Sequence, residues 1–454
     1  MSGTLLNLHE RIAQRQITLG VVGLGYVGLP VACVFAEAGF RVVGVDLKAE
    51  RVATINAGHS PIEGYEPGLA DMLARVVARE SLTATTDFGA LARADVILVS
   101  VETPVDAHHR PAYDALKAAC RSIGTVLAPG ALVVIESTIA PGTMERVVRP
   151  LIESAAGRTL NEGFFLGHCP ERVMPGKLLN NLRNLSRVCG GSTPETSAAM
   201  IALYRTIVQA DLDAADCVTA ELVKTAENAY RDVNIAFANE VALVCEATGG
   251  DFLRVRELVN KSPGRNLLFA GGGVGGHCIP KDPWLFAYGL DGYAQLRLIP
   301  AARAVNNHMP RHVADMTARA LEAMGRDLTV SKVAVLGYAY MEESDITLGS
   351  PSIELIAALE ERGATCVVHD PWIAPYQGDL LPMVTGCDAV IIMVAHQAYR
   401  TIDWVLLRNV LQTPLLVDAR RVVEAQVAHN AGLLYYAVGM GRTMALPSPD
   451  VSGD

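Results

Sequence analysis

Residues 17–46 carry the pattern that most limits what this chain can fold into. An apolar run, residues 17–22, leads into a glycine-rich turn, residues 23–28 (GLGYVG), and residues 30–39 then follow a helical pattern. A second apolar run, residues 41–45, ends in Asp46, about twenty residues beyond the glycines. This order of strand, turn, helix, strand and acid predicts a βαβ unit that binds a dinucleotide.

Each glycine of the turn has a separate physical purpose. Gly23 permits the tight turn, Gly25 lets the backbone approach a pyrophosphate, and Gly28 lets the helix pack closely on the strand. The start of the helix then faces the anion. Asp46 is expected to accept hydrogen bonds from both ribose hydroxyls and to repel a 2′-phosphate, which favours NAD over NADP.

Alternation of strands and helices continues along the chain and indicates an α/β fold. Strand-like runs at 96–101, 132–136 and 164–167 end in polar residues, where ligands of doubly wound sheets bind. The expected cofactor contacts are therefore Gly23, Gly25, Tyr26, Val27, Gly28, Asp46, Thr103 and Thr138.

A long helix is expected to separate two such sheets. The segment 213–259 is helix-rich, and residues 215–245 are apolar at helical spacing. Its broad apolar face suggests burial against a second subunit, although burial within one chain would give the same pattern. A second α/β sheet follows from residue 332, and its first turn, 337–340, lacks the spaced glycines of a second dinucleotide site.

These patterns predict two Rossmann-like, doubly wound domains joined by a long central helix. We expect an NAD-binding domain over residues 1–212, a central helical and dimerisation region over 213–325, and a C-terminal domain over 326–454. The last residues, 448–454, are polar and are expected to be frayed.

Composition narrows the class of protein. Half of the 454 residues are hydrophobic, 19% are charged and the net charge is -10, which argues against nonspecific binding to nucleic acid or to an anionic membrane. Nine scattered cysteines form neither a disulfide framework nor a zinc ribbon, and the sequence shows no signal peptide or run of about 18 apolar residues. We expect a cytosolic protein with no membrane partner.

The segment 271–283 (GGGVGGHCIPKDP) predicts a nucleophile. Five glycines in six positions are entropically unfavourable to order, and such a loop is tolerated where a backbone must approach a ligand closely. Cys278 follows at the end of this loop. The alternative is a mobile loop with an incidental cysteine.

Other candidates have simpler alternatives. Lys224 and Asn228 lie four apart and share a helix face, which is solvated unless the fold brings it to Cys278. Glu171 follows the strand-like run 164–167, where an acid or base can reach a ligand, but a surface ion pair with Arg172 or Arg183 would explain it equally. Two adjacent His-Cys pairs lack the spacing of metal ligands, so no metal is expected.

Taken together, the chain resembles the UDP-glucose/GDP-mannose dehydrogenase family over almost its whole length. The motifs that carry the resemblance are residues 23–30 (GLGYVGLP), 136–138 (EST), 169–173 (CPERV), 224–228 (KTAEN) and 275–283 (GGHCIPKDP). Within this family, CPERV and residues 231–240 (RDVNIAFANE) look most like the enzymes that act on UDP-N-acetyl-D-mannosamine and make uronic acids for surface polysaccharides.

The resemblance implies a sugar C6 alcohol oxidised to a carboxylate by two NAD molecules, in a homodimer formed through the central helix. Cys278 would attack the C6 aldehyde, and the thiohemiacetal would be oxidised to a thioester and then hydrolysed. Lys224 and Asn228 would stabilise the C6 oxyanion, Glu171 and Thr138 would hold the water, and Asp282 would orient Cys278 or that water. The implied substrate contacts are Glu171, Arg172, Val173, Lys224, Asn228, Arg231, Arg265, Asn266, Gly275 and Gly276.

At two positions the sequence differs from the family pattern for residues that bind the nucleotide. The family usually has an arginine before Ser-Pro where this chain has Leu348, and residues 263–266 (PGRN) move another arginine, Arg265, by one place. Because a guanidinium grips phosphate strongly, these changes bear on the diphosphate contacts.

Several functions are compatible with these motifs. UDP-N-acetylmannosamine is the preferred substrate, with UDP-N-acetylglucosamine or UDP-glucose as rivals that differ at C2. A catalytically impaired nucleotide-sugar-binding subunit and a two-electron alcohol dehydrogenase are alternatives of a different class.

Overall fold

The structure is a computed structural model that describes residues 2–62, 64, 66–290 and 295–441; the predicted frayed segment 448–454 lies outside them. The chain divides into two compact units. The first comprises Met1–Glu227 with Lys281–Gln295, and the second comprises Asn228–Pro280 with Leu296–Asp454.

Within its described residues, the first unit is built on an eight-stranded sheet. The strands are β1 Thr18–Val22, β2 Arg41–Val45, β3 Leu82–Thr85, β4 Val96–Val99, β5 Leu132–Ile135, β6 Phe165–His168, β7 Arg187–Gly191 and β8 Leu212–Asp216. Their order is β3-β2-β1-β4-β5-β6-β7-β8, and the pairs are parallel except for the antiparallel pair β6–β7. The first six positions have the strand order of dinucleotide-binding sheets.

Helices cover both faces of this sheet, as parallel strands require. They are α1 Ser2–Ala13, α2 Gly28–Glu37, α3 Ala49–Asn56, α4 Leu69–Ala78, α5 Asp114–Val126, α6 Arg149–Ala156, α7 Leu178–Asn184, α8 Pro194–Tyr204 and α11 Asp282–Tyr288. Residues of α2, α4 and α8 form one hydrophobic core, and residues of α5 and α6 form another. β4 and β5 are buried along their whole length, as continuous apolar runs predict.

The turn between β1 and α2 depends on glycine at two positions. Gly23 has φ +88°, which side chains rarely adopt. A Cβ on Gly28 would lie 1.9 Å from the carbonyl oxygen of Gly23, so the helix can pack on the turn only because this residue has no side chain. A Cβ on Gly25, in contrast, would meet no protein atom within 4 Å.

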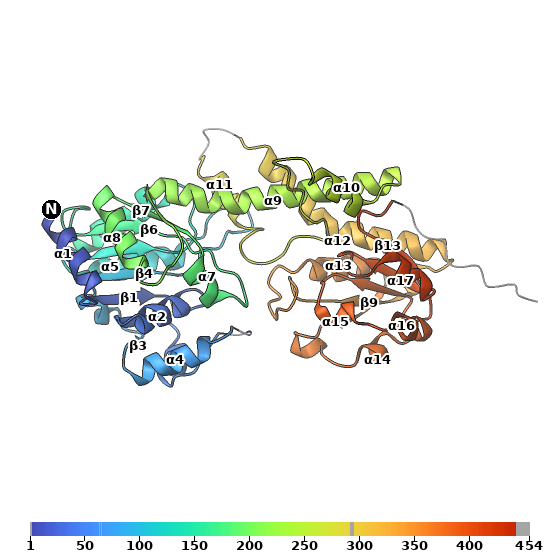
Figure 1. The fold of residues 1–454 in the computed structure, drawn as a ribbon, viewed down its shortest axis with the longest axis horizontal. Helices are drawn as coiled ribbons and strands as arrows, with labels where there is room; N and C mark the ends of the chain where they lie inside the picture. The colour runs from blue at the N-terminus through green and yellow to red at the C-terminus, as the bar shows by residue number, and fades with distance from the viewer. Residues whose placement is uncertain (1, 63, 65, 291–294, 442–454) are drawn as a thin grey trace, which may run out of the picture. The chain divides into compact units, whose positions relative to one another are not determined.

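The predicted long helix is α9, Cys217–Thr248, which Figure 1 draws in green as one continuous helix of 32 residues. The expectation of helix from residue 213 was wrong for the first residues, because Leu212–Asp216 pairs in parallel with Arg187–Gly191 as strand β8. Asp216 then accepts a hydrogen bond from the Thr219 backbone nitrogen at 2.8 Å, which satisfies an unpaired donor at the start of the helix.

The described part of the second unit contains a parallel five-stranded sheet in the order β10-β9-β11-β12-β13. Its strands are β9 Lys332–Leu336, β10 Thr365–His369, β11 Ala389–Ile392, β12 Leu415–Asp418 and β13 Leu434–Ala437. Its helices are α10 Phe252–Val259, α12 Leu298–Ala323, α13 Pro351–Glu360, α14 Leu380–Val384, α15 Gln397–Arg400, α16 Trp404–Val410 and α17 Ala425–Asn430. The predicted fold of two Rossmann-like domains joined by a long helix is confirmed.

The two sheets share one local device. In the first unit Asp46, beyond β2, accepts a hydrogen bond from the Leu24 backbone nitrogen at 2.9 Å. In the second unit Asp370, beyond β10, accepts from the backbone nitrogens of Tyr338 and Ala339 at 2.6 and 2.9 Å. An acid after the second strand therefore ties down the first turn in both sheets.

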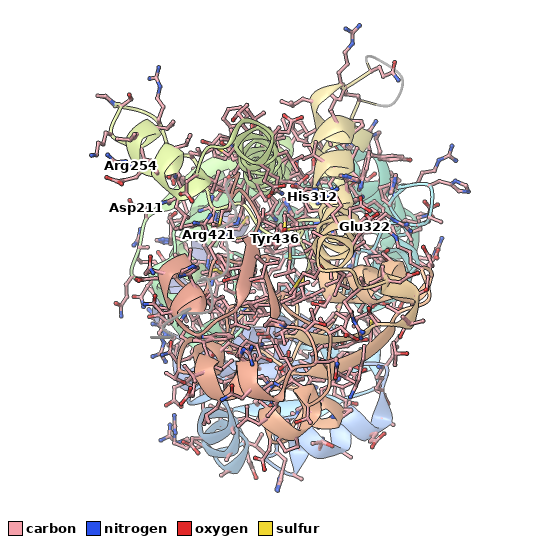
Figure 2. The ribbon with its side chains drawn as sticks, turned by 90° about the vertical axis from the view of Figure 1, so that its right-hand side faces the viewer. Asp211, Arg254, His312, Glu322, Arg421 and Tyr436 are labelled. Carbon is pink, nitrogen blue, oxygen red and sulfur yellow. The ribbon has the colours of Figure 1, made fainter. Side chains whose placement is uncertain are left out.

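Buried polar contacts join α9 to α12 within the second unit. Arg303 of α12 donates to Asp232 of α9 at 2.6 Å, and both side chains are almost fully buried. Glu246 of α9 pairs with His312 of α12 at 2.8 Å. Figure 2 shows His312 toward the interior, whereas Arg254 of α10 points outward at the edge. These contacts fix the register of the two helices.

Replacement of Arg303 tests the buried pair. Arg303→Met leaves the Asp232 carboxylate buried without its cation, so the free energy of unfolding of the second unit should fall by about 3–5 kcal/mol. Urea denaturation followed by circular dichroism measures this change. The control is Arg311→Met, on the same helix as Arg303, which removes an exposed ion pair with Glu361. It should barely move the midpoint of denaturation. Equal shifts for the two variants would contradict the prediction.

The glycine turn gives a second prediction. Gly25→Ala should leave the melting temperature unchanged, because the added methyl group meets no protein atom, but should weaken NAD binding by about tenfold or more by occupying the approach to the pyrophosphate. Gly28→Ala should lower both the melting temperature and the affinity for NAD, with a loss of about 1–3 kcal/mol in stability from overpacking. Differential scanning fluorimetry and titration calorimetry with NAD separate the two effects. A Gly25→Ala protein that binds NAD normally would contradict this prediction.

Candidate active site

The expected cofactor acid, Asp46, is buried and held in place. Its carboxylate accepts hydrogen bonds from the backbone nitrogens of Leu24 and Lys48 at 2.9 and 3.0 Å and from Arg51 at 3.0 Å. Burial acts to raise the pKa of Asp46, but these hydrogen bonds and the Arg51 charge lower it below its ordinary value. The residue is therefore an anion at neutral pH. With an open approach at Gly25, this turn fits a dinucleotide.

Two threonines at neighbouring strand ends are brought together. Thr103, which follows β4, donates its hydroxyl to the carbonyl oxygen of Thr138, which follows β5, at 2.6 Å. Lys281 donates to the carbonyl oxygen of Thr103 at 3.0 Å and lies 3.1 Å from the Asp282 carboxylate. The structure therefore brings Thr103, Thr138 and Asp282 into one group through Lys281, a connection that the sequence did not indicate.

Glu171 does not form the surface ion pair with Arg172 or Arg183 that was the alternative to a catalytic role. It is buried and forms an ion pair with Arg187 at the start of β7, whereas Arg172 donates to Glu227 at 3.0 Å and to the Ser186 carbonyl oxygen at 2.6 Å. Burial raises the pKa of Glu171, and the positive charges of Arg187 and Lys224 oppose this rise. Lys224 is itself buried on α9. The structure thus places Glu171 and Lys224 in one electrostatic environment.

The cysteine loop belongs to the second unit and is held by the protein at both ends. Asn239 of α9 accepts a hydrogen bond from the Gly271 backbone nitrogen at 3.0 Å, and the carbonyl oxygen of Leu348 accepts from Gly276 at 3.2 Å. A Cβ on Gly275 would lie 2.6 Å from the Gly349 carbonyl oxygen. The glycines therefore allow a close approach to other backbone of the same unit.

Cys278 is exposed at the end of this anchored loop. Tyr340 packs beside the loop, and burial together with the nearby Cys278 raises the pKa of that tyrosine to about 12. Tyr340 is thus a neutral neighbour at physiological pH. An exposed thiol on a loop with fixed ends can act as a nucleophile on a bound carbonyl group.

The remaining predicted contacts lie at the surface or are partly buried. Arg231, Arg265 and Asn266 are exposed, and Arg265 donates to the carbonyl oxygen of Pro263 at 2.9 Å. Arg172 is partly buried, and Val173 packs against the core of the first unit. Asn228 is partly buried on α9 at the start of the second unit.

Sequence reasoning missed several polar residues that organise these groups. Arg187 could have been found as a charge inside the run 187–191 (RVCGG), because a buried charge in a strand requires a partner. Asn239 lies on the apolar face of α9, where a buried amide requires hydrogen-bond partners. Lys281 had no comparable signal.

The described residues contain neither a membrane-spanning helix nor a group of metal ligands. No helix in them is both long enough and apolar enough to cross the bilayer. In the same ranges, histidine, cysteine and carboxylate side chains do not form groups of three or more that could hold a metal ion.

Comparison with known proteins identifies the family. Three models of the UDP-glucose/GDP-mannose dehydrogenase family match: the NAD binding domain over residues 17–208, the central domain over 218–308 and the UDP binding domain over 334–425.

Individual relatives agree with these models. The UDP-N-acetyl-D-mannosamine dehydrogenase of Pyrococcus horikoshii is 34% identical over 93% of this chain and 99% of its own length. An NDP-N-acetyl-D-galactosaminuronic acid dehydrogenase of Ralstonia nicotianae is 36% identical over 90% of this chain and 97% of its own length. A solved structure of a P. horikoshii UDP-D-ManNAc dehydrogenase superimposes with a TM-score of 0.88 at 33% identity, covering 94% of this chain and all of that one. The chain therefore belongs to the UDP-glucose/GDP-mannose dehydrogenase family and is an NAD-dependent nucleotide-sugar dehydrogenase.

Proposed function

We propose that this enzyme oxidises UDP-N-acetyl-D-mannosamine at C6 to UDP-N-acetyl-D-mannosaminuronate, a four-electron reaction that supplies an acidic sugar for polysaccharides. The observation that carries the proposal is Cys278, an exposed thiol on an anchored glycine loop in a chain that also carries an NAD-binding turn. A thiol nucleophile is what allows an alcohol dehydrogenase to continue from the aldehyde to the acid. The P. horikoshii relative bears the name of this activity.

The first oxidation removes a hydride from C6 and a proton from its hydroxyl group. Bound NAD supplies the hydride acceptor in this step and in the second oxidation. Water held by Glu171 and Thr138 takes the proton, and Lys224 and Asn228 donate to the C6 oxygen while it carries negative charge. Lysine supplies a full charge and asparagine a directed donor, which explains why both residue types occur.

The second oxidation uses the sulfur atom. Cys278 forms a C–S bond to the aldehyde carbon, and loss of a second hydride converts the thiohemiacetal into a thioester. Water, activated by Glu171, then breaks the C–S bond, releasing the carboxylate and returning the thiol. In this proposal Asp282 orients Cys278 or the water.

Residue assignments for the substrate follow the same proposal. We assign residues 1–212 to NAD binding, 213–325 to the central region and 326–454 to nucleotide-sugar binding, which the UDP binding domain match over 334–425 supports. Substrate contacts are proposed at Glu171, Arg172, Val173, Lys224, Asn228, Arg231, Arg265, Asn266, Gly275 and Gly276. Arg265 is exposed and uses one terminal nitrogen on the Pro263 carbonyl oxygen, so its other donors can reach a phosphate. A thiol nucleophile is best preserved in the reducing cytosol, where we place the enzyme.

The reaction is tested by counting electrons. Purified enzyme should release two NADH per uronate from UDP-N-acetylmannosamine, with kcat/KM at least about tenfold higher than for UDP-N-acetylglucosamine or UDP-glucose, a difference of about 1.4 kcal/mol. Chromatography of the products with absorbance at 340 nm measures both quantities. One NADH per product would indicate a two-electron alcohol dehydrogenase, and ligand binding without NADH would indicate an impaired binding subunit.

Replacement of the nucleophile tests the mechanism separately. Cys278→Ser should lower uronate formation by about three orders of magnitude, because serine lacks the activated thiolate. Mass spectrometry of wild-type enzyme under turnover should detect the acylated cysteine. Cys366→Ser, which changes a partly exposed cysteine of β10, is the control and should retain wild-type activity. Full uronate yield from Cys278→Ser would exclude the covalent route.

We also propose a homodimer formed through α9. This helix exposes Tyr230, Phe237 and Val244, with 70%, 57% and 61% of their surfaces accessible. They lie seven residues apart, the spacing at which apolar side chains line one side of a helix–helix contact. A water-exposed apolar stripe of this kind favours burial against a second copy.

A charge in this stripe should separate the subunits. Phe237→Glu places a carboxylate where the apolar contact is proposed, and light scattering should show the mass changing from two chains to one. Val405→Glu on α16, a similarly exposed apolar position, is the control and should remain a dimer. Dimeric Phe237→Glu, or a monomeric wild type, would contradict this arrangement.

A further inference from the structure

A buried polar cluster in the first unit is not explained by the roles assigned so far. It links side chains from four strands and one helix: they follow the carboxyl ends of β4, β5 and β6, open β7 and end α8. Its members are Ser100, Glu136, Glu171, Arg187 and Tyr204. Buried polar groups need hydrogen-bond partners, so the partners of each side chain indicate its role.

Arg187 lies at the centre of this cluster. One guanidinium nitrogen donates to the Glu171 carboxylate, and the other terminal nitrogen donates to the carbonyl oxygen of Leu182 in α7 at 3.0 Å. Only 2% of the arginine surface is accessible, so water does not weaken the attraction. Arg187 thus connects Glu171 to the end of α7.

The opposite side of the guanidinium rests on an aromatic ring. The guanidinium carbon of Arg187 lies 4.9 Å from the centre of the Tyr204 ring. The Tyr204 hydroxyl donates to Glu136 at 2.8 Å, and Ser100 donates to the other Glu136 oxygen at 2.7 Å. Glu136 begins the EST motif and lies two residues before Thr138. The cluster therefore joins Glu171 to the motif that contains Thr138.

Charge balance shows why the arginine matters to Glu171. Burial raises the pKa of Glu171, while Arg187 first and Lys224 second lower it. Burial also raises the pKa of Glu136 to about 7, with the Glu171 charge adding to this rise. Other titratable groups of the same environment are Cys169 and Tyr204, whose pKa values burial raises well above the ordinary range, so both are neutral at pH 7. Arg187 is the main opposition to protonation of Glu171.

We propose that Arg187 is a positioning residue for the oxidation, which keeps the Glu171 carboxylate ionised and oriented while the Tyr204 ring, whose hydroxyl is bound to Glu136, packs against the guanidinium. This inference rests on the proposed role of Glu171 as the base that activates water. A buried carboxylate without a cation takes up a proton and can no longer accept one from water. Arginine suits the position because its planar group donates to two partners at once and packs on an aromatic face.

The test compares kcat as a function of pH for wild type, Arg187→Met, Arg187→Lys and Arg149→Met, with UDP-N-acetylmannosamine and NAD. A base must be ionised, so activity falls as the pH drops through its pKa. Loss of the neighbouring cation raises that pKa by about 1–3 units. Arg187→Met should therefore shift the acid limb of the profile upward by at least about one unit, so that the loss of kcat grows as the pH falls and kcat recovers at alkaline pH.

The other variants distinguish an electrostatic role of Arg187 from a structural one. Arg187→Lys retains the positive charge and should bring the acid limb back to within about half a unit of wild type, although it cannot make every hydrogen bond of arginine. Arg149→Met removes a partly exposed arginine that pairs with Glu145 and Glu153 and should leave the profile unchanged. A uniform loss of kcat at all pH values, with the limb unmoved, would show a structural role alone and overturn the inference.

A double variant covers the case in which Arg187→Met does not fold. Glu171→Gln/Arg187→Met removes both charges of the buried ion pair, and its kcat should lie within about twofold of Glu171→Gln alone, because Arg187 acts through Glu171. A further tenfold loss would overturn the inference. Full activity of Glu171→Gln would instead refute the role of Glu171 in the proposed function. Failure of the inference about Arg187 can therefore be distinguished from failure of the proposed role of Glu171.

Discussion

Convergence of parallel strand ends at one edge of a sheet is the constraint on which the rest of this structure depends. In the first unit β1, β4, β5 and β6 all end at the same edge, so the residues that follow them are brought together although they are far apart in sequence. The NAD turn, Thr103, Thr138 and Glu171 occupy these four ends. The hydrogen bond between the two threonines is the direct product of this topology.

Buried charges are handled in the same way in both units. Glu171 meets Arg187 in the first, and Asp232 meets Arg303 in the second. In each case the carboxylate has lost its water and needs a guanidinium with further hydrogen-bond partners to remain charged. Asp232 and Arg303 stabilise helix packing, whereas Glu171 and Arg187 lie where we propose the chemistry to occur. A shared physical requirement thus serves two different purposes.

The sequence predicted the fold well because its strongest signals are local. The glycine turn, the apolar strands and the long helix each occupy a continuous stretch, β2 has the predicted limits, and the second sheet begins at the predicted residue 332. The short strand β8 was missed because LDAAD becomes a strand only through its pairing with β7. The role of Arg187 could not be predicted either, since it depends on which distant carboxylate the fold places beside it. The proposed roles of Lys224 and Asn228 came from resemblance, because their spacing alone did not supply them, whereas Cys278 was predicted as a nucleophile from its glycine loop.

The anchor at Leu348 changes how the unusual residue at that position should be understood. The cysteine loop is held there by a backbone carbonyl oxygen, a group that every amino acid provides. The side chain, 57% exposed, takes no part in that hydrogen bond. Position 348 can therefore change its side chain during evolution while the thiol loop keeps its attachment, so that recognition of the nucleotide can diverge independently of the machinery that oxidises the sugar.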